Sequence, residues 1–428
     1  MENLFIEPTV HEWPGLQARQ MLNNDSLEAI VQPVLEAVKK YGDEAVIRYN
    51  RQFGGYAGRQ LLVSNEELEM AAGLTGELKE AILLAKKNIE LFHQSQVETI
   101  RKIETMPGTV CWRKPVAIEN VGLYIPGGTA PLFSTLLMLA IPAKIAGCKN
   151  IIVCTPAAEN GTVHPAILFT AKITGINTIY KAGGAQAIAA MAYGTSTIQK
   201  CDKLFGPGNQ YVTCAKQLVS RQTAAIDMPA GPSEVAIYAD ESCVPGFVAA
   251  DLLSQAEHGA DSQVVLVASH AAICEKVMAA LRSQLEQLPR KEIAAAALKC
   301  SRFVVLKDVN QAFRFLNAYA PEHLIIASDN AAILSEQVIN AGSVFLGNYS
   351  PEAAGDYASG TNHTLPTNGN ARAYSGISVD SFVKKITFQQ LSKEGLQQIG
   401  KSVELMAAAE GLTAHKNAIT IRLNEQYD

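Results

Sequence analysis

The segment from Asp251 to Gly259 places polar residues at the spacing of one helical face. Asp251, Gln255 and His258 stand at positions i, i+4 and i+7, which fall along one stripe of a helix. Pro245 suits the first turn of this helix, and Gly259 suits its end. A polar stripe that ends in histidine could form half of a metal site or a proton-transfer site. The other half would have to come from elsewhere in the chain.

Glu322 and His323 are adjacent, at the point where a predicted helix gives way to a predicted strand. Neighbouring residues do not share a helical face, but at a turn both side chains can reach the same cleft. There the carboxylate could activate water and the imidazole could accept a proton. The alternative is a surface turn on which both groups are solvated, and the sequence favours neither interpretation.

Asp356, His363 and His415 extend the set of candidate polar groups. Asp356 and His363 bound a loop that is rich in small and polar residues, and His415 lies in the C-terminal segment. Imidazole and carboxylate groups are good ligands for zinc. However, His258, Asp356 and His415 are far apart, and the chain has no H-x-x-x-H or C-x-x-C pair. Spacing alone therefore gives little support for a metal site.

Three glycine-rich turns follow predicted strands and precede predicted helices, at residues 126–129, 182–186 and 205–209. Free backbone N–H groups at the start of a helix can hold a phosphate. None of these turns has the G-x-G-x-x-G or Walker A sequence, and a single such turn is more often only a tight turn. Because all three fall in adjacent units of one sheet, at strand ends where α/β proteins bind ligands, we expect a nucleotide cleft.

Short apolar strands alternate with helices through the middle of the chain, which predicts parallel sheets covered on both faces. The expected strands are residues 120–128 (including the first glycine-rich turn), 150–154, 178–181, 204–205, 234–238, 263–268, 303–306, 324–327 and 344–345. The expected helices are residues 132–146, 166–174, 185–193, 210–220, 248–257, 272–288, 310–319 and 331–341.

The two ends of the chain lack this alternation. Residues 26–49 and 66–96 have the pattern of long, charged, amphipathic helices, and beyond about Ser381 the chain is polar and is expected to be helical. The sparse apolar stripe of this last segment gives it little core of its own. We therefore expect it to dock on another surface, such as a second subunit.

The composition is that of a globular protein with a large core. A chain of 428 residues should form two or more domains, and 48% apolar against 18% charged residues excludes a disordered protein. The net charge of −5 argues against a nucleic-acid partner or an anionic membrane surface. No apolar run is long enough for a membrane span, and the acidic N-terminus is unlike a signal peptide. Eight cysteines scattered singly fit reduced thiols in the cytoplasm.

Several long motifs occur in a fixed order between Val121 and Asn417. They are VGLYIPGGTAPLFSTLLMLAIPAKIAGC, GGAQAIAAMAYGT, FGPGNQYVTCAK, IDMPAGPSEVAIYAD, DLLSQAEHGADSQV, PEHLII, GSVFLGNYSPEAAGDYASGTNHTLPT and ELMAAAEGLTAHKN. Together these motifs resemble the histidinol dehydrogenase family, and the N-terminal helices are also of its type. The resemblance implies an α/β fold with two Rossmann-like parallel-sheet domains and with helical N- and C-terminal extensions.

The resemblance and the pattern of strands together divide the chain into four expected parts. Residues 1–24 form an N-terminal extension, and residues 25–123 with 231–377 form a larger, discontinuous α/β domain. Residues 124–230 form a second α/β domain with the nucleotide cleft. Residues 378–428 form a helical segment that, by the resemblance, reaches across a homodimer.

The resemblance also implies which residues form the site. One zinc ion per subunit would be held by Gln255, His258, Asp356 and His415. The same ligands would bind the substrate, together with Ser233, His323 and Glu410. Both His415 and Glu410 would be contributed across the homodimer interface. NAD would contact one residue from each glycine-rich turn region: Tyr124, Gln186 and Asn209. Asp251 is then an ordinary residue, and His363 is a loop residue behind the ligands.

The implied reaction is the oxidation of L-histidinol to L-histidine through the aldehyde L-histidinal, with two NAD consumed in succession. His323 is the candidate base for the alcohol proton, and Glu322 is the candidate base for the water that adds to the aldehyde. Aldehyde oxidation can instead run through a cysteine thiohemiacetal, for which Cys154 or Cys214 could be proposed. We favour water, because neither cysteine has an activating neighbour in the sequence.

Two other classes of function stay open from the residues alone. A metallohydrolase would also use zinc, a glutamate and a histidine. A nucleotide-sensing protein would use the same sheet without chemistry. The glycine-rich turns favour a dinucleotide enzyme over the hydrolase, and the Glu322–His323 pair favours catalysis over sensing.

Overall fold

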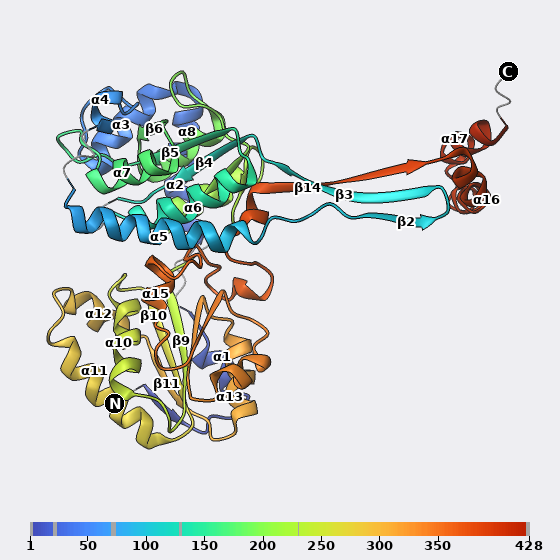
Figure 1. Ribbon diagram of the computed structural model, residues 1–428. Helices are drawn as coiled ribbons and strands as arrows, with labels where there is room; N and C mark the ends of the chain where they lie inside the picture. Colours follow the sequence, from blue (N-terminus) through green and yellow to red (C-terminus); the bar gives the residue numbers. More distant parts are fainter. Residues whose placement is uncertain (1–2, 20–23, 70–73, 128–130, 230, 425–428) are drawn as a thin grey trace. The chain divides into compact units, whose positions relative to one another are not determined.

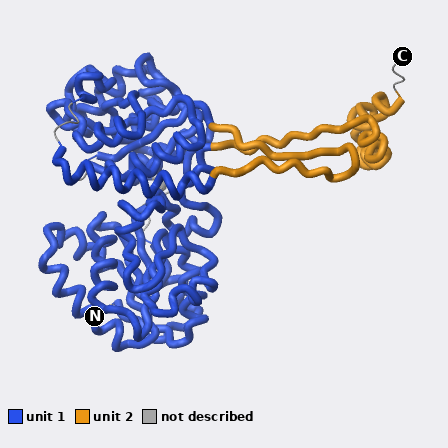
Figure 2. The backbone as a smooth tube through the Cα atoms, viewed as in Figure 1, with its two compact units in different colours: residues 1–96, 118–382 blue, residues 97–117, 383–428 orange. Residues whose placement is uncertain are grey.

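The computed structural model describes residues 3–19, 24–69, 74–127, 131–229 and 231–424. The chain divides into two compact units, which are coloured separately in Figure 2. Unit 1 contains Met1–Gln96 and Ile118–Phe382, and unit 2 contains Val97–Ala117 and Val383–Asp428. Gly128 and Thr129, which belong to the first glycine-rich turn, lie outside the described residues.

Sheet A of unit 1 consists of parallel strands in the order β1-β11-β10-β9-β12-β13 (Figure 1). Its strands are β1 (Leu4–Ile6), β9 (Glu234–Ala239), β10 (Gln263–Ala268), β11 (Arg302–Val305), β12 (His323–Ala327) and β13 (Ser343–Leu346). Every residue of β9, β10 and β12 is buried, because helices cover both faces of a parallel sheet. Each of these strands begins with a polar residue and is apolar after it. After the edge strand β1, the chain forms β9 and adds β10 and then β11 on one side of it. It then returns to the other side of β9, where it adds β12 and β13.

Sheet B, also in unit 1, repeats this order of connections. Its parallel strands lie in the order β6-β5-β4-β7-β8. They are β4 (Asn120–Tyr124), β5 (Asn150–Thr155), β6 (Ile179–Lys181), β7 (Lys203–Phe205) and β8 (Ala225–Ile226). Sheet A therefore reverses between β9 and β12, and sheet B between β4 and β7, as doubly wound nucleotide-binding folds do. The predicted pair of Rossmann-like parallel-sheet domains is confirmed.

The helices of unit 1 connect these strands. They are α1 (Trp13–Leu16), α2 (Asn24–Tyr41), α3 (Asp43–Gly54), α4 (Asn65–Glu69), α5 (Gly76–Gln94), α6 (Phe133–Ala146), α7 (Pro165–Thr174), α8 (Gly184–Tyr193), α9 (Gln210–Ser220), α10 (Pro245–Ala256), α11 (Ala271–Leu285), α12 (Lys291–Lys299), α13 (Val309–Tyr319), α14 (Ala331–Leu334) and α15 (Glu352–Tyr357).

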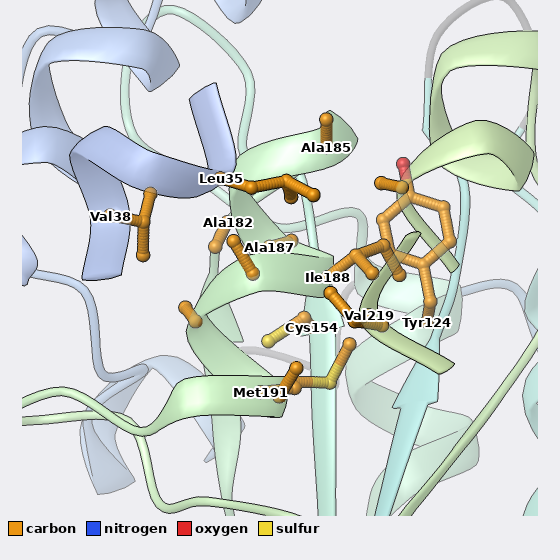
Figure 3. Packing of buried hydrophobic residues seen from close by; sticks show 14 of the residues in the cluster. Leu35, Val38, Tyr124, Cys154, Ala182, Ala185, Ala187, Ile188, Met191 and Val219 are labelled. Atoms are coloured by element: carbon orange, nitrogen blue, oxygen red, sulfur yellow. The ribbon is translucent and has the colours of Figure 1, made fainter. Parts of the chain in front are cut away.

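Small apolar side chains form the core on one face of sheet B. Figure 3 shows Leu35 and Val38 of α2 beside Ala187 of α8, with Cys154 of β5 beneath them. Every residue of α8 from Ala185 to Ala192 is buried. Because most of these residues are alanine, α2 and the strands can both pack closely against α8.

At the carboxyl ends of β9 and β12, polar residues of sheet A bind one another. The Asp240 carboxylate accepts hydrogen bonds from the hydroxyl groups of Ser328 and Ser242. The Ser242 hydroxyl in turn accepts from the backbone N–H of Asp329 (2.8 Å). These contacts tie the two strand ends together at the position where a doubly wound sheet usually binds its ligand.

Unit 2 is an antiparallel sheet with a pair of helices. Strand β3 (Thr109–Ala117) pairs with β2 (Lys102–Met106) on one side and with β14 (Val383–Leu391) on the other. The Ser392 hydroxyl caps α16 (Lys393–Ala409) by accepting from the N–H of Gly395 (3.1 Å). A Cβ atom on Gly395 would lie 2.3 Å from the Gly108 carbonyl oxygen, so only glycine lets α16 start against the β2–β3 turn. α16 packs against α17 (Thr413–Asn424).

Two predictions for the ends of the chain were wrong in part. The helix predicted for residues 26–49 is interrupted at Gly42, whose φ of +56° suits glycine and ends α2 before α3 begins. The C-terminal helices are present, but the segment after Ser381 first forms the strand β14. Its sequence, VKKITFQQL, is polar because most of its residues are exposed, and its β-branched and aromatic members favour a strand.

Two further helix predictions were too long. The helix predicted for residues 66–96 is present as α4, which ends at Glu69, and as α5, whose start is capped by Thr75. The helix predicted for residues 331–341 ends at Leu334 and continues only as a short 3-10 turn. Within the described residues, no helix combines the length and the apolar character that a bilayer span requires.

Candidate active site

Glu322 and His323 lie at the amino end of β12, the end opposite to the hydrogen bonds around Asp240. His323 is the first residue of this strand and lies beside Val235 of β9. Glu322 is 6% exposed and His323 is 3% exposed. The surface-turn interpretation is therefore wrong, because both groups have been removed from bulk water.

The contacts of His323 determine where its protons lie. Its Nδ1 atom is 3.2 Å from the carbonyl oxygen of Glu234; since a carbonyl can only accept, Nδ1 carries a proton. Its Nε2 atom faces Oδ1 of Asp356 at 3.4 Å. Burial disfavours the imidazolium, but the surrounding carboxylates, Glu322 foremost, outweigh burial and raise the pKa of His323 to about 10.

Among these carboxylates, Glu322 contributes most to raising the pKa of His323. Its Oε2 atom lies 3.6 Å from Nδ1 of His323 and accepts a hydrogen bond from the backbone N–H of Glu234 (3.0 Å). Burial raises the pKa of Glu322 to about 8, against the opposing charge of His323. A carboxyl group with a pKa near neutrality can both take up and release a proton, as a general base must.

Gln255 and Glu352 form a second buried pair beside Glu234. The Gln255 amide donates to Oε1 of Glu352 (3.1 Å) and accepts from the Glu234 N–H (2.9 Å). Ser254 donates its hydroxyl hydrogen to the same Glu352 oxygen (2.6 Å). Burial raises the pKa of Glu352 to about 7, and its Oε2 atom has no hydrogen-bond partner among the described residues. A buried acceptor without a partner is costly, which suits an atom that awaits a ligand.

Sequence reasoning missed Glu352. It is the first residue of α15 and precedes Asp356 by four positions, so the two carboxylates share one helical face. This i, i+4 spacing, in a segment already singled out, was the signal that could have identified it.

Asp356, His258 and His363 interact electrostatically with one another and with His323. Burial favours neutral Asp356, but the hydrogen bond and charge of His323 hold the pKa of Asp356 below its ordinary range. Partial desolvation by the surrounding atoms lowers the pKa of His258, and the charge of Asp356 opposes this shift. The His258 side chain still stays accessible to solvent. Burial likewise lowers the pKa of His363, whose Nε2 atom lies 3.0 Å from the Thr135 hydroxyl.

The remaining predicted site residues fall into two groups. Ser233 immediately precedes Glu234 and so lies at the same end of sheet A. Helix α10 ends at Ala256, one residue before the predicted end at Glu257, and His258 follows it in a turn. Glu410 and His415 belong to unit 2, at the end of α16 and in α17, and both are exposed there.

Three of the four predicted zinc ligands thus lie in unit 1, around the candidate bases. Within the described residues, no three His, Cys, Asp or Glu side chains are already arranged as a metal site. The protonation states nevertheless suit a cation, because metal ligands must be deprotonated, and the pKa values of both Asp356 and His258 are lowered. An ionised carboxylate and a neutral imidazole are zinc ligands.

A cavity of about 870 Å³ opens at the carboxyl ends of the strands of sheet B, where nucleotides bind in doubly wound folds. All three predicted NAD contacts line it: Tyr124, Gln186 and Asn209. A volume in this range suits a cofactor. The cavity is also lined by Asn50 of α3 and by Tyr56 in the loop after α3, which sequence reasoning missed because they come from the N-terminal part of the chain.

The polar groups of this cavity are fixed by local structure. The Tyr124 hydroxyl accepts from the N–H of Gly184 at the start of α8 (3.0 Å), and Figure 3 shows its ring directed toward that helix. Asn209 caps α9 by accepting from two backbone N–H groups. The Gln186 amide donates to Asn50 (3.2 Å), while its buried Oε1 atom has no partner among the described residues. This acceptor is available for a nucleotide.

Glycine is required where the cavity walls meet. Gly206 has φ of +124°, and a Cβ atom there would lie 2.1 Å from the carbonyl oxygen of Tyr124. Gly127 and Gly183 both lie against Pro156, so the turns after neighbouring strands pack on one proline ring. The glycine-rich turns therefore allow close packing of three strand ends as well as access to backbone N–H groups.

The two cysteines considered for the aldehyde step are poorly suited to it. Cys154 is fully buried in the core of sheet B, and Cys214 is 6% exposed on α9. Burial raises the pKa of Cys154 well above its usual range and also raises the pKa of Cys214. Since the thiolate is the nucleophile, neither side chain is activated.

Comparison with known proteins agrees over nearly the entire chain. The family model described as histidinol dehydrogenase matches residues 17–423. Histidinol dehydrogenase of Bacteroides thetaiotaomicron is 57% identical over 425 residues, covering 99% of both chains. Histidinol dehydrogenase of Escherichia coli strain K12 is 48% identical over 97% of this chain and 98% of its own. The crystal structure of histidinol dehydrogenase from Elizabethkingia anophelis superposes with a TM-score of 0.96 at 55% identity, covering 98% of both chains. The chain therefore belongs to the histidinol dehydrogenase family.

Proposed function

We propose that the protein oxidises L-histidinol to L-histidine through L-histidinal, as a zinc-dependent, NAD-linked enzyme of histidine biosynthesis acting in the cytoplasm. Family membership supports the substrate. The observation that carries the chemistry is the buried Glu322–His323 pair beside Asp356. The cavity lined by Tyr124, Gln186 and Asn209 supports a dinucleotide as the hydride acceptor, and it favours a dehydrogenase over a metallohydrolase.

His323 removes the alcohol proton in the first oxidation. Because Nδ1 is held by the Glu234 carbonyl, Nε2 is the atom that exchanges a proton with the substrate. The hydroxyl proton passes to Nε2 while the carbinol carbon gives hydride to NAD, which leaves the aldehyde and NADH. Positioned proton transfer of this kind is worth about 10²–10⁴ in rate.

Glu322 serves the second oxidation. It accepts a proton from water as the water oxygen adds to the aldehyde carbon. Glu322 then gives this proton to the former aldehyde oxygen, which completes the hydrate and restores the base. The hydrate then loses hydride to a second NAD and a proton to the base, and the product is the carboxylic acid. The burial that raises the pKa of Glu322 to about 8 makes it a stronger base than an exposed carboxylate.

Zinc would be held by Gln255, His258 and Asp356, with His415 supplied by a second copy of the chain. When bound, it would orient the substrate and neutralise Asp356, which removes one of the charges that raise the pKa of His323. Ser233 and Glu410 would contact the substrate. For this ligand set Gln255 must turn its amide oxygen away from the Glu234 N–H, to which it is now hydrogen-bonded.

The direct test follows NADH absorbance when the protein is mixed with zinc, NAD and L-histidinol. We expect two NADH per L-histidine formed, and a loss of about 10²-fold or more in His323→Asn. The matched control is His270→Asn, which changes an exposed histidine that precedes α11 and lies outside both the Glu322–His323 cluster and the cavity of sheet B. Failure of the unaltered protein to form NADH above a metal-stripped control would refute the proposed function.

A further inference from the structure

Glu234 connects the candidate bases to a part of the chain that the proposed function does not use. It is the first residue of β9 and is 2% exposed. Its backbone N–H donates to Oε2 of Glu322 (3.0 Å), and its carbonyl oxygen lies 3.2 Å from Nδ1 of His323. The main chain of Glu234 therefore holds both bases at once.

The side chain of Glu234 is held by the N-terminal extension. Its Oε2 atom accepts from Nε of Arg19 at 2.6 Å, and its Oε1 atom accepts from the backbone N–H of Asn368 (2.5 Å). The Arg19 side chain is only 14% exposed. A carboxylate buried in this way needs a charged, hydrogen-bonded partner, so the position of Glu234 depends on Arg19.

The same guanidinium also holds the turn that leads to the bases. Nη2 of Arg19 donates to the carbonyl oxygen of Tyr319 (2.8 Å) and reaches that of Ala320 (3.5 Å). The guanidinium carbon lies 4.0 Å from the centre of the Tyr319 ring. Ala320 has φ of +53°, which is uncommon for a residue with a side chain, and it precedes Glu322 by two positions. Arg19 thus bridges the start of β9 and the turn that enters β12.

We propose that Arg19 is a positioning residue for Glu322 and His323. It touches neither base and acts through Glu234 and through the turn at Ala320. A planar guanidinium has donors in fixed directions and can serve a carboxylate and a carbonyl together, which the single ammonium of lysine does less well. The proposal rests on the roles that the proposed function gives to Glu322 and His323.

Steady-state kinetics with L-histidinol and NAD test this role. In Arg19→Gln we expect kcat to fall by about 10- to 100-fold while both KM values change by less than about threefold, because misplaced catalytic groups slow chemistry more than binding. Arg19→Lys, which keeps the charge, should recover part of the loss. The control is Gln17→Ala. Gln17 anchors the same extension to α13 by donating to the Phe315 carbonyl (3.0 Å) without touching Glu234, and its kcat should be unchanged.

A double-substitution cycle separates positioning from general stability. If Arg19 acts through His323, Arg19→Gln should cause less than about a twofold further loss in a His323→Asn background. Multiplicative losses, or an equal fall of kcat in Gln17→Ala, would overturn the proposal. A His323→Asn enzyme with full activity would instead overturn the proposed function. Thermal unfolding shows whether Arg19→Gln folds. If it does not, Arg19→Lys replaces it in the steady-state kinetics and in the double-substitution cycle.

Discussion

The side chains around His323 set its charge. Nearby carboxylates, Glu322 foremost, raise the pKa of His323 to about 10, so the imidazole holds two protons at neutral pH while no other cation among the described residues offsets the charge of Asp356. A base must be free of its second proton. The bases and the predicted metal ligands are therefore coupled, and a change in any one of these charges alters the protonation of the others.

Glu322→Gln should separate the two oxidation steps. The amide keeps the size of the side chain but cannot accept a proton, so water addition loses its base while His323 is retained. We expect oxidation of L-histidinal to fall by about 10²-fold or more and oxidation of L-histidinol to the aldehyde to fall much less. Single-turnover NADH formation from each substrate measures the two steps. Equal losses would remove Glu322 from the water step.

The pKa of Asp251 leads to a prediction about the stability of the protein rather than about catalysis. Burial raises its pKa to about 7, so the unfolded chain releases this proton at a lower pH than the folded protein does. The neutral Asp251 carboxyl therefore favours the folded protein. This contribution to stability is fully present below about pH 4 and is lost as the pH rises through about 7.

Asp251→Asn should remove this pH dependence. Relative to the unaltered protein, the variant should gain of the order of 2 kcal/mol of unfolding free energy between pH 4.5 and pH 8, after allowance for partial exposure. Urea unfolding at these two pH values measures the gain. Because Asp251 lies outside the predicted ligand set, activity should be retained, and a large loss of kcat would show that it has a role in the site.

The sequence led to candidate site residues but not to the contacts that hold them in place. Gln255, His258 and Asp356 were named, and the structure gathers them around His323. Arg19 and Glu234 were not, because their contact joins positions 215 residues apart. No local pattern marks an arginine in an extension as the partner of a residue that begins a central strand.

The turn after β7 determines how sheet B closes around its cavity. Gly206→Ala would force a Cβ atom against the Tyr124 carbonyl in addition to an unfavourable φ. We expect it to cost roughly 3 kcal/mol or more of stability and to weaken NAD binding. Gly347→Ala is the matched control, since Gly347 also has a positive φ of +86° but no atom within 4 Å of a new Cβ. It should cost about 1–2 kcal/mol.

Chemical unfolding and NAD titration of both variants test this difference. Equal losses of stability would mean that backbone conformation alone, and not the approach of Tyr124, requires glycine at position 206.

Helices and strands with strong periodic patterns could be predicted from the sequence almost to their ends. The helix expected at residues 210–220 is α9 without change, and the strand expected at residues 263–268 is β10. Strand β14 could not be predicted, because most of its residues stay exposed in the sheet that it forms with β3, and its polar sequence does not mark a buried strand. The edge strand β1 was missed for a similar reason, as three residues carry too little pattern.

Unit 2 exposes the residues that the proposed function assigns to a second subunit. No described residue of α17 is buried, and His415 lies on this helix. If His415 serves a neighbouring chain, His258→Ala and His415→Ala chains should complement each other. In a hybrid dimer one site has both histidines and the other has neither.

Random mixing of the two inactive variants should therefore restore about a quarter of the original activity. Hybrids can be isolated with two different affinity tags before the NADH assay. Hybrids of demonstrated composition that stay inactive would place His258 and His415 in sites of the same chain, or in no shared site.

Sheets A and B have similar strand orders, but their candidate functional residues lie at opposite ends of the strands. The candidate bases lie at the amino end of β12 in sheet A, and the cavity lies at the carboxyl ends of the strands in sheet B. A cavity opens at the carboxyl ends of sheet B, whereas at the equivalent place in sheet A hydrogen bonds from Ser242 and Ser328 to Asp240 join the strand ends. Five positions along β12 separate Ser328 from His323, a span of about 16 Å. This end of sheet A is therefore a place where protein engineering could introduce a new site. Replacing Asp240, Ser242 and Ser328 with smaller residues could create a binding site for a dye or an artificial effector. The site would be far enough from His323 to leave the catalytic chemistry undisturbed.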